Sequence, residues 1–188
     1  MTLRFRLTAV FLFVAIAPAL AAGTPADDWE KTFNAGLDAE TRGDLASAVR
    51  SFESALSDAE QLRQDGVIVT TLNKLATVLR ARGDYGKAEQ RYKQVLERVD
   101  KFFGGNKMMA ATALNGLGAA YLAQGKYAEA EPLLKRAIDL ERTAFETSDP
   151  RRARSLYTLA QVYGAQGQFG RAEPLYQDAV KLDRKSVV

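Results

Sequence analysis

The stretch ALNGLGAAYLAQGKYAEAEPLLKRAIDLERTAF, residues 113–145, indicates how this chain folds. Before its central Gly125, leucine, glycine and tyrosine recur from Leu114 to Tyr121 at the i, i+3, i+4 and i+7 spacing of one helical face. A second apolar face of the same kind follows the glycine. Glycine readily takes the left-handed conformation that ends a helix. The stretch therefore predicts two helices that pair around a tight turn.

The same register recurs four times along the chain. Its turn glycines lie 40, 42 and 42 residues apart and are Gly43, Gly83, Gly125 and Gly167. Each is followed by a leucine or aromatic residue two positions on and by an alanine five positions on. A fixed period of this length is typical of a solenoid, whose repeats each pack only on their neighbours. We expect antiparallel helices over about residues 27–41, 45–61, 66–82, 86–103, 107–124, 128–146, 151–166 and 170–185.

Proline and small residues constrain where these helices begin and how closely they pack. Pro132 and Pro174 lack an amide hydrogen, which costs no hydrogen bond in the first turn of a helix. We therefore expect the second helix of the third unit to begin at about Glu129. Gly118 and Ala130 have little or no side chain, so the axes of their two helices should approach closely.

The pattern resembles the tetratricopeptide repeat, a helix–turn–helix unit with the signature W-x2-L-G-x2-Y…A-x3-F…P. The third unit matches it at Leu114, Leu117, Gly118, Tyr121, Ala130, Leu134 and Ala137. Leucine replaces the tryptophan in units two to four, and Arg142 and Arg184 stand where the closing proline would be. The period of 42 residues, against the usual 34, is similar to the longer repeat of kinesin light chains and their bacterial relatives.

This resemblance covers about residues 27–185. It implies an all-α fold, a right-handed superhelical solenoid of antiparallel helix pairs. The four repeats would span about residues 27–65, 66–106, 107–149 and 150–185, within a solenoid domain of residues 23–188.

The first 22 residues have the pattern of a signal peptide. Arg4 and Arg6 form a basic start, an apolar run follows, and Ala19-Leu20-Ala21 is a small-x-small cleavage site. We expect cleavage after Ala21 or Ala22. The alternative is a membrane anchor, but the apolar run is shorter than the about 20 residues that a span needs. The sequence thus predicts an exported protein with no membrane span in the mature chain, periplasmic in a Gram-negative bacterium and otherwise secreted.

The composition excludes several kinds of site. The chain has neither cysteine nor histidine, so it has no Cys/His zinc site, no thiol nucleophile and no histidine general base. Because every carboxylate has an ordinary place on a helical surface, we expect no enzyme, metal or cofactor. Without Arg4 and Arg6 the net charge of +3 becomes +1, from 24 basic and 23 acidic residues. We therefore expect no nucleic-acid partner, which would need a strong basic field.

In the family that the pattern resembles, the first helices of successive repeats line a concave groove. The resemblance implies that a peptide or a partner helix binds there. The candidate groove residues are Phe33, Leu37, Asn73, Thr77, Arg80, Asn115, Leu122, Arg154, Tyr157 and Gln161, and Thr70 and Thr112 fall on the same face. The expected function is a non-catalytic protein–protein interaction module, acting as an adaptor or assembly factor in the cell envelope.

Two groups of polar residues in this groove each allow two interpretations. Asn73 and Asn115 hold equivalent positions in adjacent repeats. An asparagine amide both donates and accepts hydrogen bonds, so a spaced pair can hold a peptide backbone of any sequence. Alternatively, both face solvent or bond a neighbouring helix. Arg151, Arg152 and Arg154 either meet an acidic partner or form a solvated helix end.

The ends of the solenoid and one apolar turn leave further alternatives. The last helix either caps itself with polar residues such as Arg171 or stacks on another chain, which makes a self-associating scaffold the alternative function. Trp29 either covers the exposed end of the first repeat or belongs to an interface. The residues that flank the Gly104-Gly105 turn are Phe102, Phe103, Met108 and Met109. They could form an exposed apolar loop, but we expect most of them to pack between units two and three.

Overall fold

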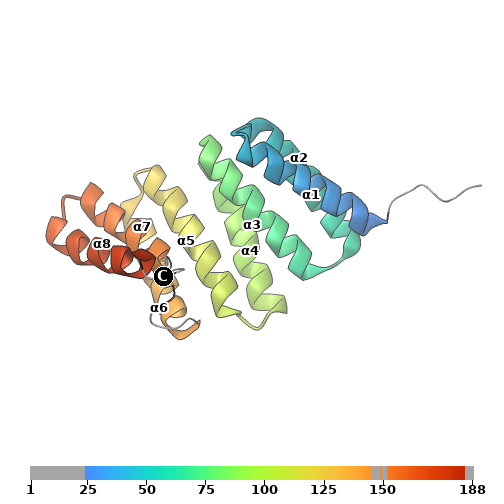
Figure 1. Ribbon diagram of the computed structural model, residues 1–188. Coiled ribbons are helices and arrows are strands. Elements are labelled where there is room, and N and C mark those ends of the chain that lie inside the picture. The colour runs from blue at the N-terminus through green and yellow to red at the C-terminus, as the bar shows by residue number, and fades with distance from the viewer. Residues whose placement is uncertain (1–23, 145–148, 150–151, 185–188) are drawn as a thin grey trace, which may run out of the picture.

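The computed structural model describes residues 24–144, 149 and 152–184, and within them it has eight α-helices and no strand. The helices are α1 (Pro25–Thr41), α2 (Leu45–Leu62), α3 (Asp65–Arg82), α4 (Tyr85–Phe102), α5 (Lys107–Ala123), α6 (Tyr127–Ala144), α7 (Ala153–Ala165) and α8 (Phe169–Arg184). In Figure 1 they follow one another as four antiparallel pairs. These bounds lie within two residues of the expected ones. The predicted leader, Phe145 and Arg151 lie outside the described residues.

The four turn glycines have the backbone conformation that the repeat requires of them. Gly43, Gly83, Gly125 and Gly167 have φ angles of 75°, 91°, 72° and 74°. An added Cβ at any of them would meet no atom within 4 Å, so glycine is needed for its conformation and not for space. The amide after each glycine donates to the carbonyl five residues earlier, as Asp84 does to Leu79 at 2.9 Å. Their predicted role as turn residues is confirmed.

The expected start of α6 was two residues too late. The helix begins at Tyr127 and not at Glu129, so that Pro132 lies inside it. The reason is the turn, because each second helix begins two residues after its glycine, whether or not a proline follows. Pro132 therefore removes the hydrogen bond that its position would donate to the carbonyl of Ala128.

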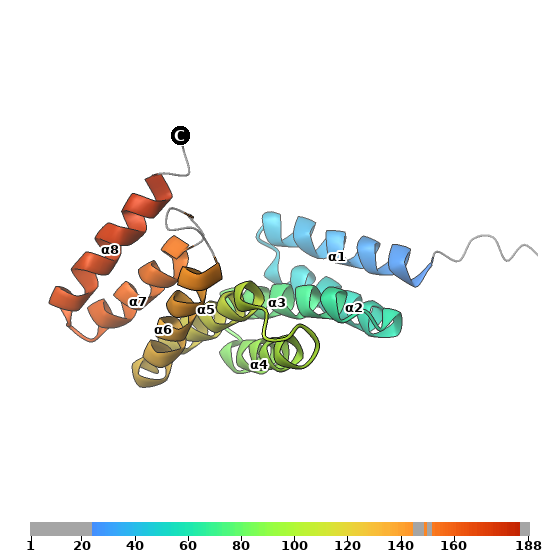
Figure 2. The ribbon, with the colours of Figure 1, turned by 90° about the horizontal axis from the view of Figure 1, so that it is seen from below.

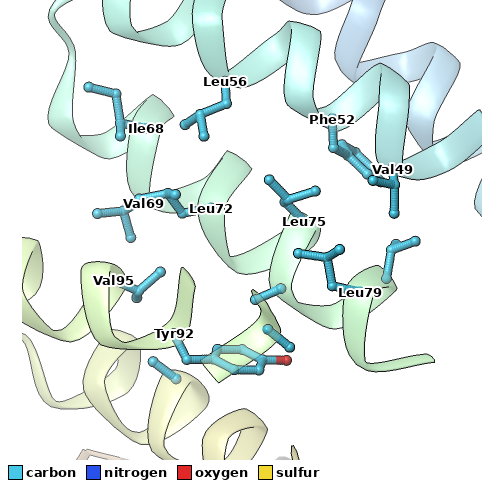
Figure 3. Close-up of a cluster of buried hydrophobic side chains, with 14 of the residues drawn as sticks. Val49, Phe52, Leu56, Ile68, Val69, Leu72, Leu75, Leu79, Tyr92 and Val95 are labelled. Carbon is cyan, nitrogen blue, oxygen red and sulfur yellow. The ribbon is translucent and has the colours of Figure 1, made fainter. Parts of the chain in front are cut away.

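The core lies between consecutive helices and continues from one pair to the next. Figure 3 shows Val49, Phe52 and Leu56 of α2 and Tyr92 and Val95 of α4 on either side of the apolar residues of α3. Phe52 and Leu75 are both completely buried. In the third pair a Cβ on Gly118 would lie 2.7 Å from Cγ of Leu134. The prediction that a small residue there allows close helix approach is therefore confirmed.

Polar contacts also repeat with the period of the solenoid. The hydroxyl of Tyr121 donates to Glu89 of the preceding pair at 2.8 Å, and 42 residues on Tyr163 donates to Glu131 at 2.9 Å. Lys135 pairs with the same Glu131 carboxylate at 2.7 Å. The hydrogen bond from Lys135, and then that from Tyr163, lowers the pKa of Glu131 from 4.5 to about 2. Each contact of this type ties a second helix to the first helix of the next repeat.

The helix pairs are arranged in an arc. Figure 2 shows α1, α3, α5 and α7 following one another along its inner side, with the second helices of the pairs outside them. The inner side therefore presents the helices on which the candidate groove residues lie. None of the described helices is long and apolar enough to cross a membrane.

Candidate functional site

A pocket of about 480 Å³ is lined mainly by residues of the first helices α3, α5 and α7. It is lined by Val69, Thr70, Asn73 and Lys74 of α3, Val95 of α4, Met108, Met109, Thr112 and Asn115 of α5, Glu141 of α6 and Arg154 of α7. Its volume is in the range of sites that hold a small molecule or a large side chain. Asn73, Asn115 and Arg154, with Thr70 and Thr112, were expected on this face, and the structure brings these five together.

The walls of the pocket are largely apolar. Val69 and Val95 are buried at its base, and Met109 is partly buried against the core. Met108 is 44% exposed. Methionine side chains are flexible and adapt to the shape of a ligand. The pocket can therefore hold an aliphatic chain.

The expectation that most of the residues around the Gly104-Gly105 turn pack inside holds for two of the four. Phe103 and Met109 pack against the core, but Phe102 is 47% exposed and Met108 44%. Successive side chains along a helix point about 100° apart. Phe102 and Met108 are each next to one of the two packed residues and therefore face outward. For Met108 that direction is the pocket.

A buried polar network closes one side of the pocket. The amide nitrogen Nδ2 of Asn115 donates to Oγ of Ser155 at 2.8 Å, and Ser155 donates to Oε1 of Glu141 at 2.7 Å. Asn115, Ser155 and Glu141 are 6%, 0% and 5% exposed. They come from α5, α7 and α6, so this polar network joins the third repeat to the fourth. Of the two interpretations of Asn115, the Nδ2 contact corresponds to a bond with a neighbouring helix.

Two buried acceptor atoms belong to residues that line this pocket and receive no hydrogen bond from any described residue. They are Oε2 of Glu141 and Oδ1 of Asn73, here called the two open acceptors. Burial raises the pKa of Glu141 from 4.5 to about 7, although the bond from Ser155 and the charges of Arg152 and Arg154 act in the opposite direction. The protein thus maintains an acid of near-neutral pKa in an apolar recess.

The expectation that every carboxylate lies on a helical surface is wrong for Glu141. In the preceding repeat its register position, 42 residues earlier, is Val99, which is 1% exposed. The corresponding position for Ser155 is Ala113, which is completely buried. Polar residues at positions that are valine and alanine in the preceding repeat were the sequence signal for this site.

The basic residues of the pocket differ in their surroundings. Lys74 contacts the carboxylate of Glu40 at 3.3 Å. Arg154 is exposed to solvent at the edge of the pocket. The charge of Arg154 lowers the pKa of Glu141, but burial, which raises it, has the larger effect. Arg154 is therefore exposed to solvent, while the open acceptors are buried.

The other candidate groove residues do not line this pocket. Phe33 stacks edge-on against Phe52 at 5.3 Å between centroids, and Leu37 packs against the same core. The hydroxyl of Thr77 donates to the backbone carbonyl of Asn73 at 2.9 Å. Nε of Arg80 is buried and has no hydrogen-bond partner in the described part of the chain. These residues mainly support the first helices.

Towards the fourth repeat, the remaining candidates spread along the inner face. Leu122 packs into the apolar cluster of the last two repeats. Tyr157 is 50% exposed and lies edge-on to Tyr176, with 5.4 Å between centroids. Gln161 is half-buried one turn further along α7.

The two ends of the solenoid differ in how they are covered. At the first end, Nε1 of Trp29 donates to Oγ1 of the buried Thr71 at 2.9 Å, so this tryptophan packs on the second repeat. At the last end, Phe169 is 72% exposed and Val180 48%. Arg171 nevertheless reaches the carboxylate of Glu131 at 3.0 Å. The last helix thus combines polar contacts with exposed apolar side chains.

Within the described residues, no group of three or more acidic side chains is placed to hold a metal ion. The arrangement of the pocket suits noncovalent binding, because its lining combines apolar walls with residues that have unpaired buried acceptors.

The sequence profile of the tetratricopeptide repeat matches residues 67–143 and again residues 109–185, which together are more than half of the chain. The chain belongs to the tetratricopeptide repeat family. Its predicted fold class, an all-α helical solenoid of such repeats, is confirmed. A search of the curated proteins finds no significant match.

Solved tetratricopeptide-like structures share the fold at low sequence identity. BtubC (BKLC) from P. vanneervenii matches 88% of this chain and 67% of its own, with a TM-score of 0.74 and 20% identity. A protein from Podosopora anserina, assigned as a kinesin light chain with nearly identical TPR-like repeats, matches 90% of this chain and 81% of its own, with a TM-score of 0.71 and 20% identity. A Rap protein complexed with Competence and Sporulation Factor matches 87% of this chain but 45% of its own, with a TM-score of 0.75 and 17% identity.

Proposed function

We propose that this protein is a non-catalytic interaction module that binds a peptide or helix of a partner protein along the inner side of its arc. The pocket between α3, α5 and α7 is the anchoring site. One observation carries this proposal: a recess with apolar walls contains two buried acceptors that the described protein leaves without donors. Such atoms are costly unless a ligand or an ordered water molecule supplies the missing hydrogen bonds.

Membership of the family supports the same conclusion. Tandem repeats of this kind form extended concave surfaces that are used for binding. The structurally similar Rap protein was solved in complex with Competence and Sporulation Factor, so a solenoid of this shape can bind another molecule. The signal-peptide pattern of residues 1–22 supports a role as an adaptor or assembly factor in the cell envelope, in the periplasm of a Gram-negative source.

Photo-crosslinking tests the proposed groove directly. A photoreactive amino acid at Thr112, which lines the pocket, is compared with one at Gln90, which is exposed on the outer helix α4. In the exporting cell, the Thr112 variant should form a specific adduct with a partner protein and the Gln90 variant should not. Equal labelling from the two positions, or none from Thr112, would refute binding in the groove.

The structure also changes which asparagine is suited to a mutational test. Asn73→Ala removes an open acceptor and should weaken partner binding at an unchanged melting temperature. Asn115→Ala would break the buried hydrogen bond to Ser155, so a loss of binding could not be separated from a loss of stability.

A self-associating scaffold is the alternative function, and the exposed Phe169 and Val180 on α8 favour it. It predicts that the mature protein self-associates as its concentration rises and that Val180→Glu returns it to the monomer. Light scattering at increasing concentration distinguishes the two functions, since a protein that stays monomeric removes the scaffold.

A further inference from the structure

The buried polar atoms of the pocket lining that lack a partner are both hydrogen-bond acceptors. When Glu141 is ionised, above its pKa of about 7, both open acceptors, Oε2 of Glu141 and Oδ1 of Asn73, offer lone pairs and no hydrogen. Asn115, the other buried amide of the lining, already directs its Nδ2 to Ser155. A ligand group that reaches these acceptors must therefore bring donor hydrogens.

The walls define what carries that donor group. Val69, Met108 and Met109 present aliphatic and thioether surface to the pocket. A long, unbranched aliphatic stem fits such walls, because it buries its methylene groups while its polar end reaches the acceptors. Among protein side chains, lysine and arginine combine such a stem with a donor-only head.

We propose that the pocket binds a lysine or arginine side chain of the partner, with its stem between the methionines and its head on Oε2 of Glu141 and Oδ1 of Asn73. This assignment rests on the proposed groove function. An ionised carboxylate that is 5% exposed is costly, because burial outweighs the charges of Arg152 and Arg154 in its effect on the pKa of Glu141. A cationic head reduces that cost through charge-assisted hydrogen bonds.

The positive charges near Glu141 make an anionic ligand the competing assignment. Arg152 and Arg154 lie on the α7 side, Asp149 lies in the connection before α7, and Lys74 lines the α3 side. Lys74 is paired with Glu40, Arg154 is exposed, and burial of Glu141 outweighs the charges of Arg152 and Arg154 in its effect on the pKa of Glu141. An anion that reached the open acceptors would face the Glu141 carboxylate and leave both acceptors unsatisfied, which disfavours it.

Methionine methyl groups provide a local readout of binding. The chain has three methionines, of which Met108 and Met109 line the pocket and Met1 lies outside the described residues. The full chain, labelled with ¹³C at the methionine methyl groups, is titrated at pH 8 with acetyl-Ala-Ala-X-Ala-Ala-amide. The central residue X is lysine, norleucine or glutamate, so that only its head group changes. The lysine peptide should bind about tenfold more tightly than the norleucine peptide, and the glutamate peptide most weakly.

Two variants separate the charge of Glu141 from the apolar walls. Glu141→Gln should reduce the affinity for the lysine peptide to that for the norleucine peptide and leave the latter unchanged. Arg154→Gln removes a positive charge that repels the lysine head and should tighten binding of the lysine peptide. If the pocket were an anion site, the same variant would instead lose binding of the glutamate peptide. Glu129→Gln, on the exposed face of the same helix α6, is the matched control and should behave as the parent protein.

The outcomes distinguish the two levels of the proposal. Equal affinity for the three peptides, or a preference for glutamate, would overturn the cationic assignment and leave peptide binding in the groove standing. If no peptide shifts the methyl signals of Met108 and Met109, both the assignment and the anchoring role of the pocket are wrong. A lysine preference that persists in Glu141→Gln would also overturn the assignment.

Discussion

Replacing Glu141 with glutamine should stabilise the protein at pH 8 and leave its stability almost unchanged at pH 4.5. Glutamine has nearly the same shape and can accept the same hydrogen bond from Ser155, which the carboxylate receives at 2.7 Å. It differs chiefly in that it never ionises. The variant therefore measures the cost of the buried negative charge.

The magnitude follows from the pKa of Glu141, which burial raises from 4.5 to about 7. The folded protein keeps a proton there that the unfolded chain has lost, so the free energy of unfolding falls as the pH rises from about 4.5 to about 7. Each pKa unit corresponds to about 1.4 kcal/mol. Ionisation of Glu141 therefore costs the folded parent protein about 3 kcal/mol at pH 8, and Glu141→Gln avoids that cost.

Urea denaturation at several pH values between 4.5 and 8 provides the assay, with helicity followed by circular dichroism. Other titrating groups are common to both proteins, so the difference in their free energies of unfolding isolates Glu141. That difference should grow from near zero to about 3 kcal/mol across this range. Glu129→Gln should follow the parent protein at every pH. A difference between parent and Glu141→Gln that does not change with pH would refute the argument for a buried acid.

Three further predictions concern packing, acid stability and the first repeat. Gly118→Ala places a Cβ 2.7 Å from Cγ of Leu134 and should lower the free energy of unfolding by about 1 to 3 kcal/mol in urea denaturation; a neutral result would contradict the close approach. Ammonium and phenol donors lower the pKa of Glu131 to about 2, so stability should fall as the pH drops from about 4.5 towards 2, and Glu131→Gln should remove about 1 to 2 kcal/mol of that fall. Trp29→Phe loses the hydrogen bond to Thr71 and should cost about 1 kcal/mol, measured by circular dichroism because Trp29 is the only tryptophan; an unchanged midpoint would show that this bond contributes nothing.

The fold could be predicted because its determinants are local and repeated. Each turn glycine is needed for a positive φ angle, and each second helix begins two residues after it, as α4 does at Tyr85 after Gly83. The start of α6 was placed two residues too late because Pro132 was given more weight than this turn geometry. A proline lowers the stability of a helix interior, but a fixed turn upstream decides where the helix begins.

The site was predicted only in part, because its chemistry depends on contacts between repeats. Face periodicity alone placed Asn73, Asn115 and Arg154 on the inner side. Periodicity could not show that Asn115 bonds Ser155, 40 residues away, or that Ser155 completes a bond to Glu141. Comparison of the register between repeats would have identified Glu141, since Val99 occupies its position in the preceding repeat.

The polar network also determines which part of the solenoid should open first. In a repeat protein, stability is approximately a sum of repeat and nearest-neighbour terms, so a cost at one junction weakens that junction alone. Glu141 and Ser155 replace apolar residues at the junction of α6 and α7, and the cost of ionised Glu141 arises there. The last pair, α7 and α8, should therefore lose protection from hydrogen exchange as the pH rises through about 7.

The first pair, α1 and α2, provides the internal control for this prediction, because it is also terminal but lacks the polar network. Fraying of a terminal pair would affect both ends equally and would not depend on residue 141. In Glu141→Gln the protection factors of α7 and α8 should stay constant with pH, while those of α1 and α2 match the parent protein. A bound lysine peptide should have the same effect on the parent protein, because a ligand that pairs with the ionised carboxylate stabilises the state that contains it. Equal pH dependence of protection at the two ends would show that the charge of Glu141 does not control the junction.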